Sequence, residues 1–312
     1  MQDVQLSIAR EDGRGASNPV FSIGGNSRWK LAHEGLEGFD SVPVTVSTQG
    51  YAQYDGSYLL AERAAELDRT VSAVAVGDVA ALRAEAEAFF IPRREYRVSV
   101  EAEGRRRFFR ARHYAMSLRV DNVTGAQLLD WTCLALDPYM YDEESNSFNI
   151  VEGRAKRGFP FVSFARRVAP QPTLMRIPAE PETHVGGMVA SVMSRTLRMR
   201  NSGSATTYPR FDITAVGEVR DPEVTIADSG GREVCRFGVS VTMRAGDVLT
   251  VDFSARPTLI TLNGRNVSNL AKPGSTLVTG IEPGDFDLSW SAAFGDAAMS
   301  MVPTIRNRYG SI

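Results

Sequence analysis

The stretch REYRVSVEAEGRRRFFRARHYAMSLRV, residues 94–120, decides the fold of the first half of the chain. Its apolar residues lie in two runs on either side of Glu103-Gly104, the pattern of two antiparallel strands joined by a tight turn. We therefore expect a β-hairpin that turns near Glu103-Gly104. Downstream, WTCLALDPYMY (131–141) has the composition of a further strand, which ends at Asp137-Pro138.

The segment before this hairpin predicts a helix. In VAALRAEAEAFF, residues 79–90, apolar side chains recur at helical spacing, Asp78 is a suitable N-cap, and Pro92 stops the helix. Further strands are expected at residues 4–9, 42–48 and 69–76. Residues 1–145 are therefore predicted to form an N-terminal domain, in which one helix packs on a mostly antiparallel sheet.

The second half of the sequence has a different character. Residues 146–194 contain five prolines and no sustained period, which predicts a linker with long loops. From residue 195 onward, short β-type segments alternate with turn signals such as Asn263-Gly264 and Pro283-Gly284. We expect residues 195–312 to form a β-sandwich, so that the predicted fold class is α+β and mainly β.

Length and composition restrict the class of protein. At about 100–200 residues per domain, 312 residues suggest two domains. The 35 basic and 37 acidic residues give a net charge of −2, which argues against a dedicated nucleic-acid binder. No apolar run approaches the roughly 20 residues that span a bilayer, and the start of the chain does not have the pattern of a signal peptide. We expect the protein to stay where it is made unless it leaves within an assembly.

The residues that usually carry chemistry are sparse. The three histidines, His33, His113 and His184, do not have the spacing of metal ligands, and no G-x-S-x-G motif is present. Cys133 and Cys235 predict two buried free thiols rather than a disulfide framework or a thiolate zinc site. The sequence predicts no catalytic, cofactor-binding, metal-binding or nucleic-acid-binding residue.

Two sets of polar residues leave alternatives open. The first set could bind or cleave a sugar; its members are Asp285, Asp287 and Trp290, with Asp252 on another strand. The alternation of Asp285, Asp287 and Ser289 with Phe286, Leu288 and Trp290 instead favours a strand whose apolar side, including Trp290, lies in the core.

The second set is the basic cluster on the second hairpin strand, where Arg105, Arg106 and Arg107 follow the turn and Arg110 and Arg112 come after them. Acidic residues of the partner strand favour cross-strand ion pairs or inter-subunit contacts over contacts with nucleic acid. The acidic members are Glu95, Glu101 and Glu103.

The order of short motifs along the chain resembles the distal tail protein (Dit) family of long-tailed, siphovirus-type bacteriophages. In the first half, the matching residues are Gly35-Leu36, Gly50, Asp55-Gly56, Arg69, Pro92, Gly104 and Asp137-Pro138-Tyr139. In the second half, they are Asn201, Gly203, Pro209, Gly246-Asp247, Leu249, Asp252, Leu262-Asn263-Gly264, Pro283-Gly284 and Arg308-Tyr309. The motifs cover nearly the whole chain, and residues 142–194 match least.

The resemblance implies a structural virion protein and not an enzyme. It implies an N-terminal domain that forms a hexameric ring and a galectin-like C-terminal sandwich outside the ring. The ring would join the tail tube protein to the tail-tip hub and to receptor-binding or baseplate proteins. Its lumen would let the tape-measure protein and then DNA pass. Such a protein is made in the cytoplasm of the host bacterium and resides in the virion tail.

For this ring we expect Arg105, Arg106 and Arg107 on the hairpin, with Glu143 and Glu144 in the acidic stretch DEESNS, to contribute inter-subunit or tube contacts. Two other classes remain as alternatives. One is a carbohydrate-binding module of the tail tip, although no histidine follows His184, which sugar-binding galectins would need in the sandwich. The other is a cell-wall glycosidase.

Overall fold

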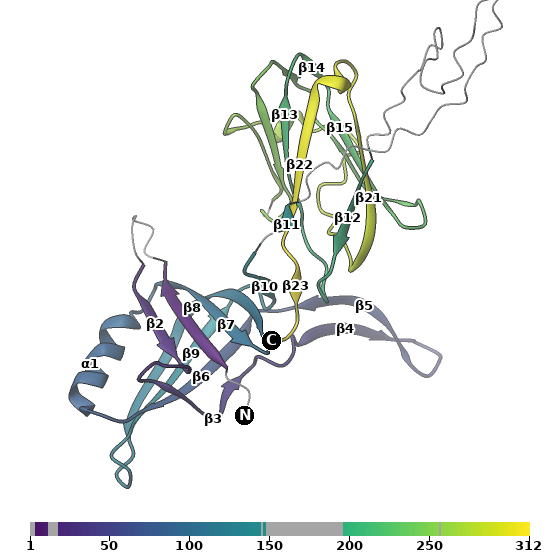
Figure 1. Ribbon diagram of the computed structural model, residues 1–312. Helices are drawn as coiled ribbons and strands as arrows, with labels where there is room; N and C mark the ends of the chain where they lie inside the picture. The colour runs from purple at the N-terminus through teal and green to yellow at the C-terminus, as the bar shows by residue number, and fades with distance from the viewer. Residues whose placement is uncertain (1–3, 12–17, 145, 148–195, 256) are drawn as a thin grey trace, which may run out of the picture.

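The computed structural model describes residues 4–11, 18–144, 146–147, 196–255 and 257–312. Figure 1 shows a sheet that carries the helix α1, a β-sandwich next to it, and a long hairpin, β4–β5, that extends away from the sheet. The predicted class, mainly β with one α-helix, is confirmed in this part of the chain. None of the helices described is long and apolar enough to cross a membrane.

A nine-stranded antiparallel sheet forms the N-terminal domain. The main path is β2-β1-β7-β8-β9-β6-β3, while β10 pairs with both β8 and β23. The strands are β1 (Gln5–Arg10), β2 (Val20–Ile23), β3 (Lys30–Glu37), β6 (Leu67–Ala75), β7 (Glu95–Ala102), β8 (Arg105–Val120), β9 (Gln127–Ala135), β10 (Met140–Asp142) and β23 (Arg308–Tyr309).

The helix α1 (Val79–Phe89) covers one face of this sheet, as its apolar spacing predicts. Asp78 caps it, because its carboxylate accepts a hydrogen bond from the backbone N–H of Ala80 at 3.0 Å. The helix buries Leu82, Ala86 and Phe89. These side chains join the buried core that contains Trp131, so that the helix and the sheet share one core.

The β7–β8 hairpin turns where the sequence predicts. Ala102 pairs with Arg105, so that Glu103 and Gly104 form a two-residue loop. Both have positive φ, 53° and 74°, as a type I′ turn requires. This turn sets the register that places Arg105 and Arg106 at the end of the sheet.

His113 gives the N-terminal domain a predicted pH dependence. It lies on β8 beside a register shift, and its Nδ1 accepts a hydrogen bond from Nε1 of Trp131 at 3.1 Å. Burial lowers the pKa of His113, so the unfolded chain binds the proton more tightly and stability falls as the pH drops below about 6.5. We expect the midpoint of thermal unfolding to fall between pH 7.5 and 5.5, and to fall less in His113→Gln, as followed by circular dichroism. Equal slopes in both proteins would contradict this assignment.

The C-terminal domain is a β-sandwich. One sheet has six strands in the order β11-β22-β13-β18-β19-β20, and the other has four in the order β12-β21-β15-β16. The strands of the larger sheet are β11 (Asn146–Ser147), β13 (Arg210–Ala215), β18 (Val248–Asp252), β19 (Leu259–Leu262), β20 (Arg265–Asn266) and β22 (Met299–Ile305). Those of the smaller sheet are β12 (Thr196–Asn201), β15 (Glu223–Asp228), β16 (Glu233–Gly238) and β21 (Gly284–Ser291). A short pair, β14 (Val219–Arg220) and β17 (Thr242–Met243), and the 3₁₀ turns η1 (Ser268–Leu270) and η2 (Asp296–Ala298) complete the domain.

The strand β21 has the core alternation expected from its sequence. Phe286, Leu288 and Trp290 are buried between the two sheets, while Asp287 is exposed. Asp252 lies on β18 in the opposite sheet. Trp290 therefore offers no exposed ring for stacking on a sugar.

The chain crosses between the two domains twice, and both crossings lie at the end of the sandwich next to the N-terminal sheet (Figure 1). β11 pairs with β22 inside the sandwich, whereas β23 leaves the sandwich and pairs with β10 of the N-terminal sheet. A division at 1–145, 146–194 and 195–312 therefore cuts through two strand pairings. Residues 148–195 lie outside the described part of the structure, and with them most of the predicted linker and His184.

Candidate functional site

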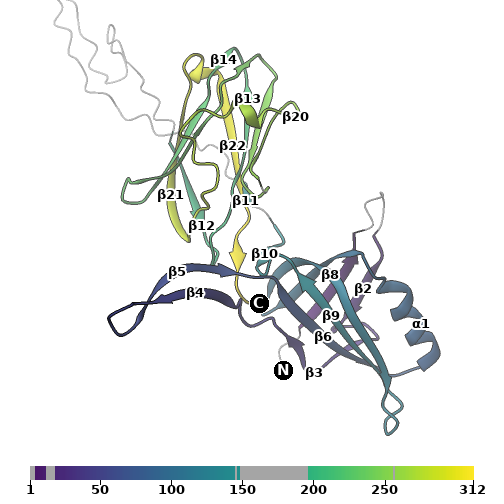
Figure 2. The same ribbon diagram turned by 180° about the vertical axis from the view of Figure 1, so that it is seen from behind.

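The strands β4 (Val44–Gly50) and β5 (Ser57–Ala64) form a separate two-stranded sheet, which we call the arm, residues 44–64. The arm projects from the foot of the sandwich in the opposite direction to α1 (Figures 1 and 2). Every residue of the two strands is exposed except half-buried Ala64. A two-stranded hairpin alone is marginally stable in water, so the arm is a candidate for docking on a partner.

The strand register gathers apolar side chains on one face of the arm. Val44 and Val46 alternate onto the same face of β4, and Leu59 lies opposite Thr48 on that face, beyond a β-bulge. Val46 is 53% exposed and Leu59 is 56% exposed. Glu62 lies opposite Val46 on the same face, so the exposed apolar side chains stand beside one carboxylate. Exposed apolar side chains that gather in this way are typical of an interaction surface.

The tip of the arm is aromatic. The rings of Tyr51 and Tyr58 are 5.5 Å apart, and Tyr54 is 78% exposed beside the turn at Asp55-Gly56. Tyrosines are enriched in protein interfaces because they bury a large area and keep a hydrogen-bonding hydroxyl. The tip therefore extends the interaction surface of the arm.

None of the interface residues predicted from the sequence lies in the arm. The alternation of Val42, Val44 and Val46 did predict a strand with one apolar face. Alternation predicts an apolar face, but it does not show whether another element of the same chain buries that face. The exposure of the arm could therefore not be predicted from the sequence.

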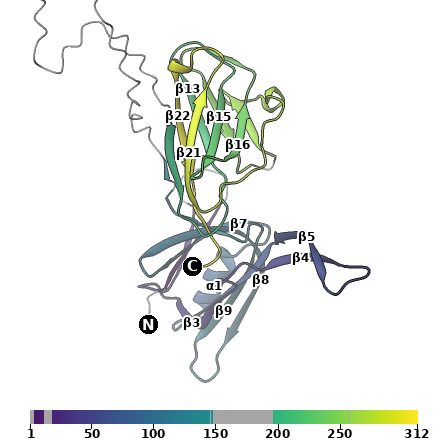
Figure 3. The same ribbon diagram turned by 90° about the vertical axis from the view of Figure 1, so that its right-hand side faces the viewer.

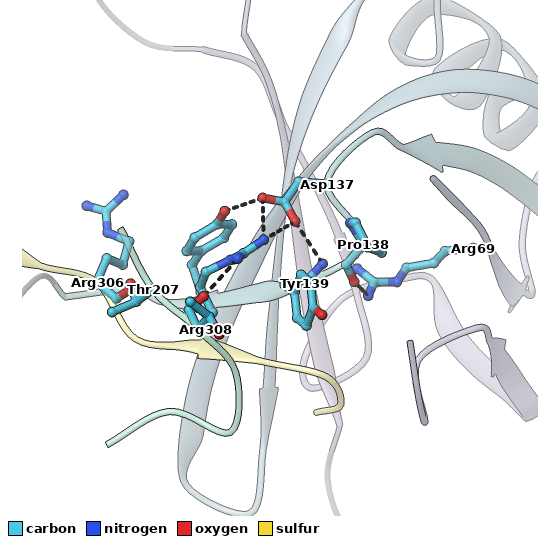
Figure 4. A network of polar contacts seen from close by, with 9 residues as sticks. Arg69, Asp137, Pro138, Tyr139, Thr207, Arg306 and Arg308 are labelled. Atoms are coloured by element: carbon cyan, nitrogen blue, oxygen red, sulfur yellow. Dashed lines mark hydrogen bonds and ion pairs between the residues drawn. The ribbon is translucent and has the colours of Figure 1, made fainter. Parts of the chain in front are cut away.

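A second candidate region is the domain joint, where residues 306–311 return to the N-terminal sheet (Figures 3 and 4). Arg308 is 8% exposed and donates from Nη2 to both carboxylate oxygens of Asp137, at 2.8 and 3.0 Å. Its Nη1 donates to the carbonyl oxygen of Thr206 at 2.8 Å. Tyr141 also donates its hydroxyl proton to Asp137, and burial raises the pKa of Tyr141, so that it stays a donor.

Arg69 connects this joint to the root of the arm. It is fully buried, with its guanidinium 4.2 Å from the ring centre of Phe109 and 5.3 Å from that of Phe39. Nε donates to the carbonyl oxygen of Gly38 at 3.0 Å, and Nη2 donates to that of Pro138 at 2.7 Å. One side chain thus ties the segment leading into the arm to the segment leading into β10.

The predicted interface arginines have different surroundings. Arg105 and Arg106 begin β8 and are exposed. Arg107 is only 6% exposed, and its Nη1 donates to the carbonyl oxygen of Ser311 at 2.6 Å. Arg107 therefore belongs to the domain joint.

The acidic residues are also divided. Glu143 pairs with Arg97 at 2.8 Å, within the chain, while Glu144 is exposed. Of the expected cross-strand pairs, the structure brings together Glu95 and Arg112 at 2.7 Å.

The described residues do not assemble a site for metal chemistry. No group of three or more His, Cys, Asp or Glu side chains among them is placed to hold a metal ion. Cys133 and Cys235 are both buried free thiols, and burial raises the pKa of each to about 12, which keeps them protonated and unreactive at neutral pH.

Comparison with solved structures identifies the fold as that of phage tail-hub proteins. The chain is similar to the SPP1 Dit protein, described as a paradigm of the hub adsorption apparatus in phages that infect Gram-positive bacteria. The TM-score is 0.63 at 12% identity, over 97% of this chain and 98% of that chain. It is also similar to a chain of the phage P2 baseplate in its activated conformation, with Ca (TM-score 0.52) and with Sr (0.53), each at 9% identity over 99% of both chains.

These likenesses extend over both domains and confirm the fold predicted from the resemblance to distal tail proteins. No family model and no curated protein matches the sequence.

Proposed function

We propose that this protein is a structural virion protein of a long-tailed phage, the distal tail hub, and that six copies form a ring. The observation that carries the proposal is the arm, which exposes one apolar face on a chain with the fold of the SPP1 Dit protein. The number six comes from the resemblance to distal tail proteins.

In a ring, each subunit offers one surface to the neighbour on one side and a different surface to the neighbour on the other, so every arm finds a partner. An unpaired apolar arm on a free monomer would instead be a liability for aggregation. The exposed residues Arg105, Arg106 and Glu144 remain proposed contacts of the ring or the tube, whereas Arg107 and Glu143 are engaged within the chain.

The ring would join the tail tube protein to the tail-tip hub and to receptor-binding or baseplate proteins in the virion tail. Its lumen would pass the tape-measure protein and DNA, and the net charge of −2 suits a channel that must not retain DNA. The proposed role needs no enzymatic activity and no cofactor.

Light scattering of the purified full-length chain at several concentrations tests the proposal. We expect a mass of about six times the 34.1 kDa chain, or twelve times if two rings stack, and closed rings in electron micrographs. Open filaments or a different closed symmetry would contradict the hexamer.

A further inference from the structure

A cavity of about 420 Å³ lies between the β7–β8 hairpin and the returning strand β23. It combines three consecutive arginines of the N-terminal sheet with Asp142 at the end of β10, Ser202 directly after the sandwich strand β12, and Tyr309 of β23. We call it the arginine pocket; its lining residues are Arg105, Arg106, Arg107, Asp142, Ser202 and Tyr309.

Arg107 is the buried arginine of the pocket. Its guanidinium carbon lies 3.7 Å from the ring centre of Tyr309, and Nη1 is bonded to Ser311. The Nε atom is buried and has no hydrogen-bond partner among the described residues. A buried donor without an acceptor is costly, and such groups are rare in folded proteins. The described residues therefore leave part of the hydrogen-bonding capacity of Arg107 unused, as they do for Nη1 of Arg69 and Nε of Arg308.

The charges of the pocket are also unbalanced. Asp142 is the only carboxylate in the lining, and it already accepts hydrogen bonds from Nδ2 of Asn307 at 2.9 Å and from the hydroxyl of Tyr309 at 3.1 Å. Among the described residues, neither Arg105 nor Arg106 forms an ion pair, although Glu101 lies opposite Arg106 in the register. Two exposed guanidiniums and one buried guanidinium thus face a single, occupied carboxylate.

We propose that the arginine pocket binds a carboxylate side chain, Asp or Glu, from an acidic segment of a partner protein. The planar fork of arginine matches a carboxylate with two parallel hydrogen bonds, and the ring of Tyr309 supplies an apolar wall for the methylene groups. The cavity has room for a side chain but not for a nucleic-acid duplex, whose binding needs phosphate contacts spread along a surface. This inference concerns the single chain and does not depend on the hexamer.

Titration calorimetry of the full-length chain with acetylated hexaglutamate tests the inference, with hexaglutamine as the uncharged control. We expect hexaglutamate alone to bind, and the double variant Arg105→Gln/Arg106→Gln to weaken its binding by about tenfold. Both residues are exposed, so this variant keeps the fold. The matched control is Arg110→Gln/Arg112→Gln, which removes the same charge from exposed positions of the same strand outside the pocket.

Equal weakening in the two double variants would show a general charge effect and overturn the inference, as would the absence of hexaglutamate binding. Inorganic phosphate and a 20-base-pair DNA duplex are titrated separately. If phosphate or the duplex binds as tightly as hexaglutamate, and this binding is lost in the Arg105→Gln/Arg106→Gln variant, the proposal is overturned. The ligand of the pocket is then a free anion or DNA and not a protein carboxylate.

Discussion

The double variant Val44→Asp/Val46→Asp is expected to leave the chain folded and to convert the proposed ring into monomers. Both residues lie on the apolar face of the arm, and both are exposed in the single chain, 45% and 53%. Changes at exposed positions usually alter the free energy of unfolding by less than about 0.5 kcal/mol. In the ring, each change would bury a carboxylate and remove apolar contact area worth roughly 1–2 kcal/mol.

A closed ring multiplies this effect, because every one of its interfaces carries the same two changes. Light scattering at matched concentrations measures the mass, and circular dichroism checks the fold. The matched control is Thr45→Asp/Ser47→Asp, which adds the same charge to the opposite face of the same strand. A hexamer in the control and a monomer in the test variant would assign the interface to the apolar face. Hexamers in both variants would exclude that face from the interface.

Local patterns in the sequence predicted the elements well, because their causes are local. The spacing of Leu82, Ala86 and Phe89 defines a helix face that is buried in the structure. The Glu103-Gly104 turn and the alternation around Trp290 depend only on neighbours in the chain, and both are found where expected.

Non-local contacts explain what could not be predicted. Arg105 and Arg107 are two residues apart on one strand, yet Arg105 is exposed while Arg107 is buried against Tyr309, about two hundred positions later. Because the two residues are so far apart in the sequence, the local pattern of the hairpin does not predict their contact. The exposure of Val46 is the reverse case, since its alternation predicts a buried face and the tertiary structure does not cover it.

Arg69 is the sharpest example, because a strand that begins with arginine is ordinarily expected to place it in solvent. It is instead fully buried. In the sequence, Arg69 stands out only as one of the motif residues that carry the resemblance to distal tail proteins. Burial lowers its pKa to about 10, so the guanidinium is still charged at neutral pH. Nε and Nη2 donate to the carbonyl oxygens of Gly38 and Pro138, and the rings of Phe39 and Phe109 flank the guanidinium, while Nη1 has no hydrogen-bond partner among the described residues.

We expect Arg69→Ala to lower the free energy of unfolding of the N-terminal domain by about 3–5 kcal/mol, because it opens a cavity and removes the donors to the buried carbonyl of Pro138 and the half-buried carbonyl of Gly38. Arg69→Lys is expected to recover only part of this loss, since an ammonium group cannot reproduce the fork that reaches both carbonyls. Urea unfolding followed by tryptophan fluorescence measures the change, because Trp29 and Trp131 lie in the same core.

The control for this measurement is Arg110→Ala, which removes an exposed arginine that pairs with Glu11 and should cost less than about 1 kcal/mol. Gly38 lies six residues before the arm, and Pro138 lies two residues before β10. Loss of the Arg69 fork should therefore also loosen the root of the arm and the domain joint. Hydrogen exchange in Arg69→Lys should become faster in β10 and β23, with no change in the strands of the sandwich core. An Arg69→Ala protein within 1 kcal/mol of the parent chain would show that Phe39 and Phe109 close over the site without the arginine.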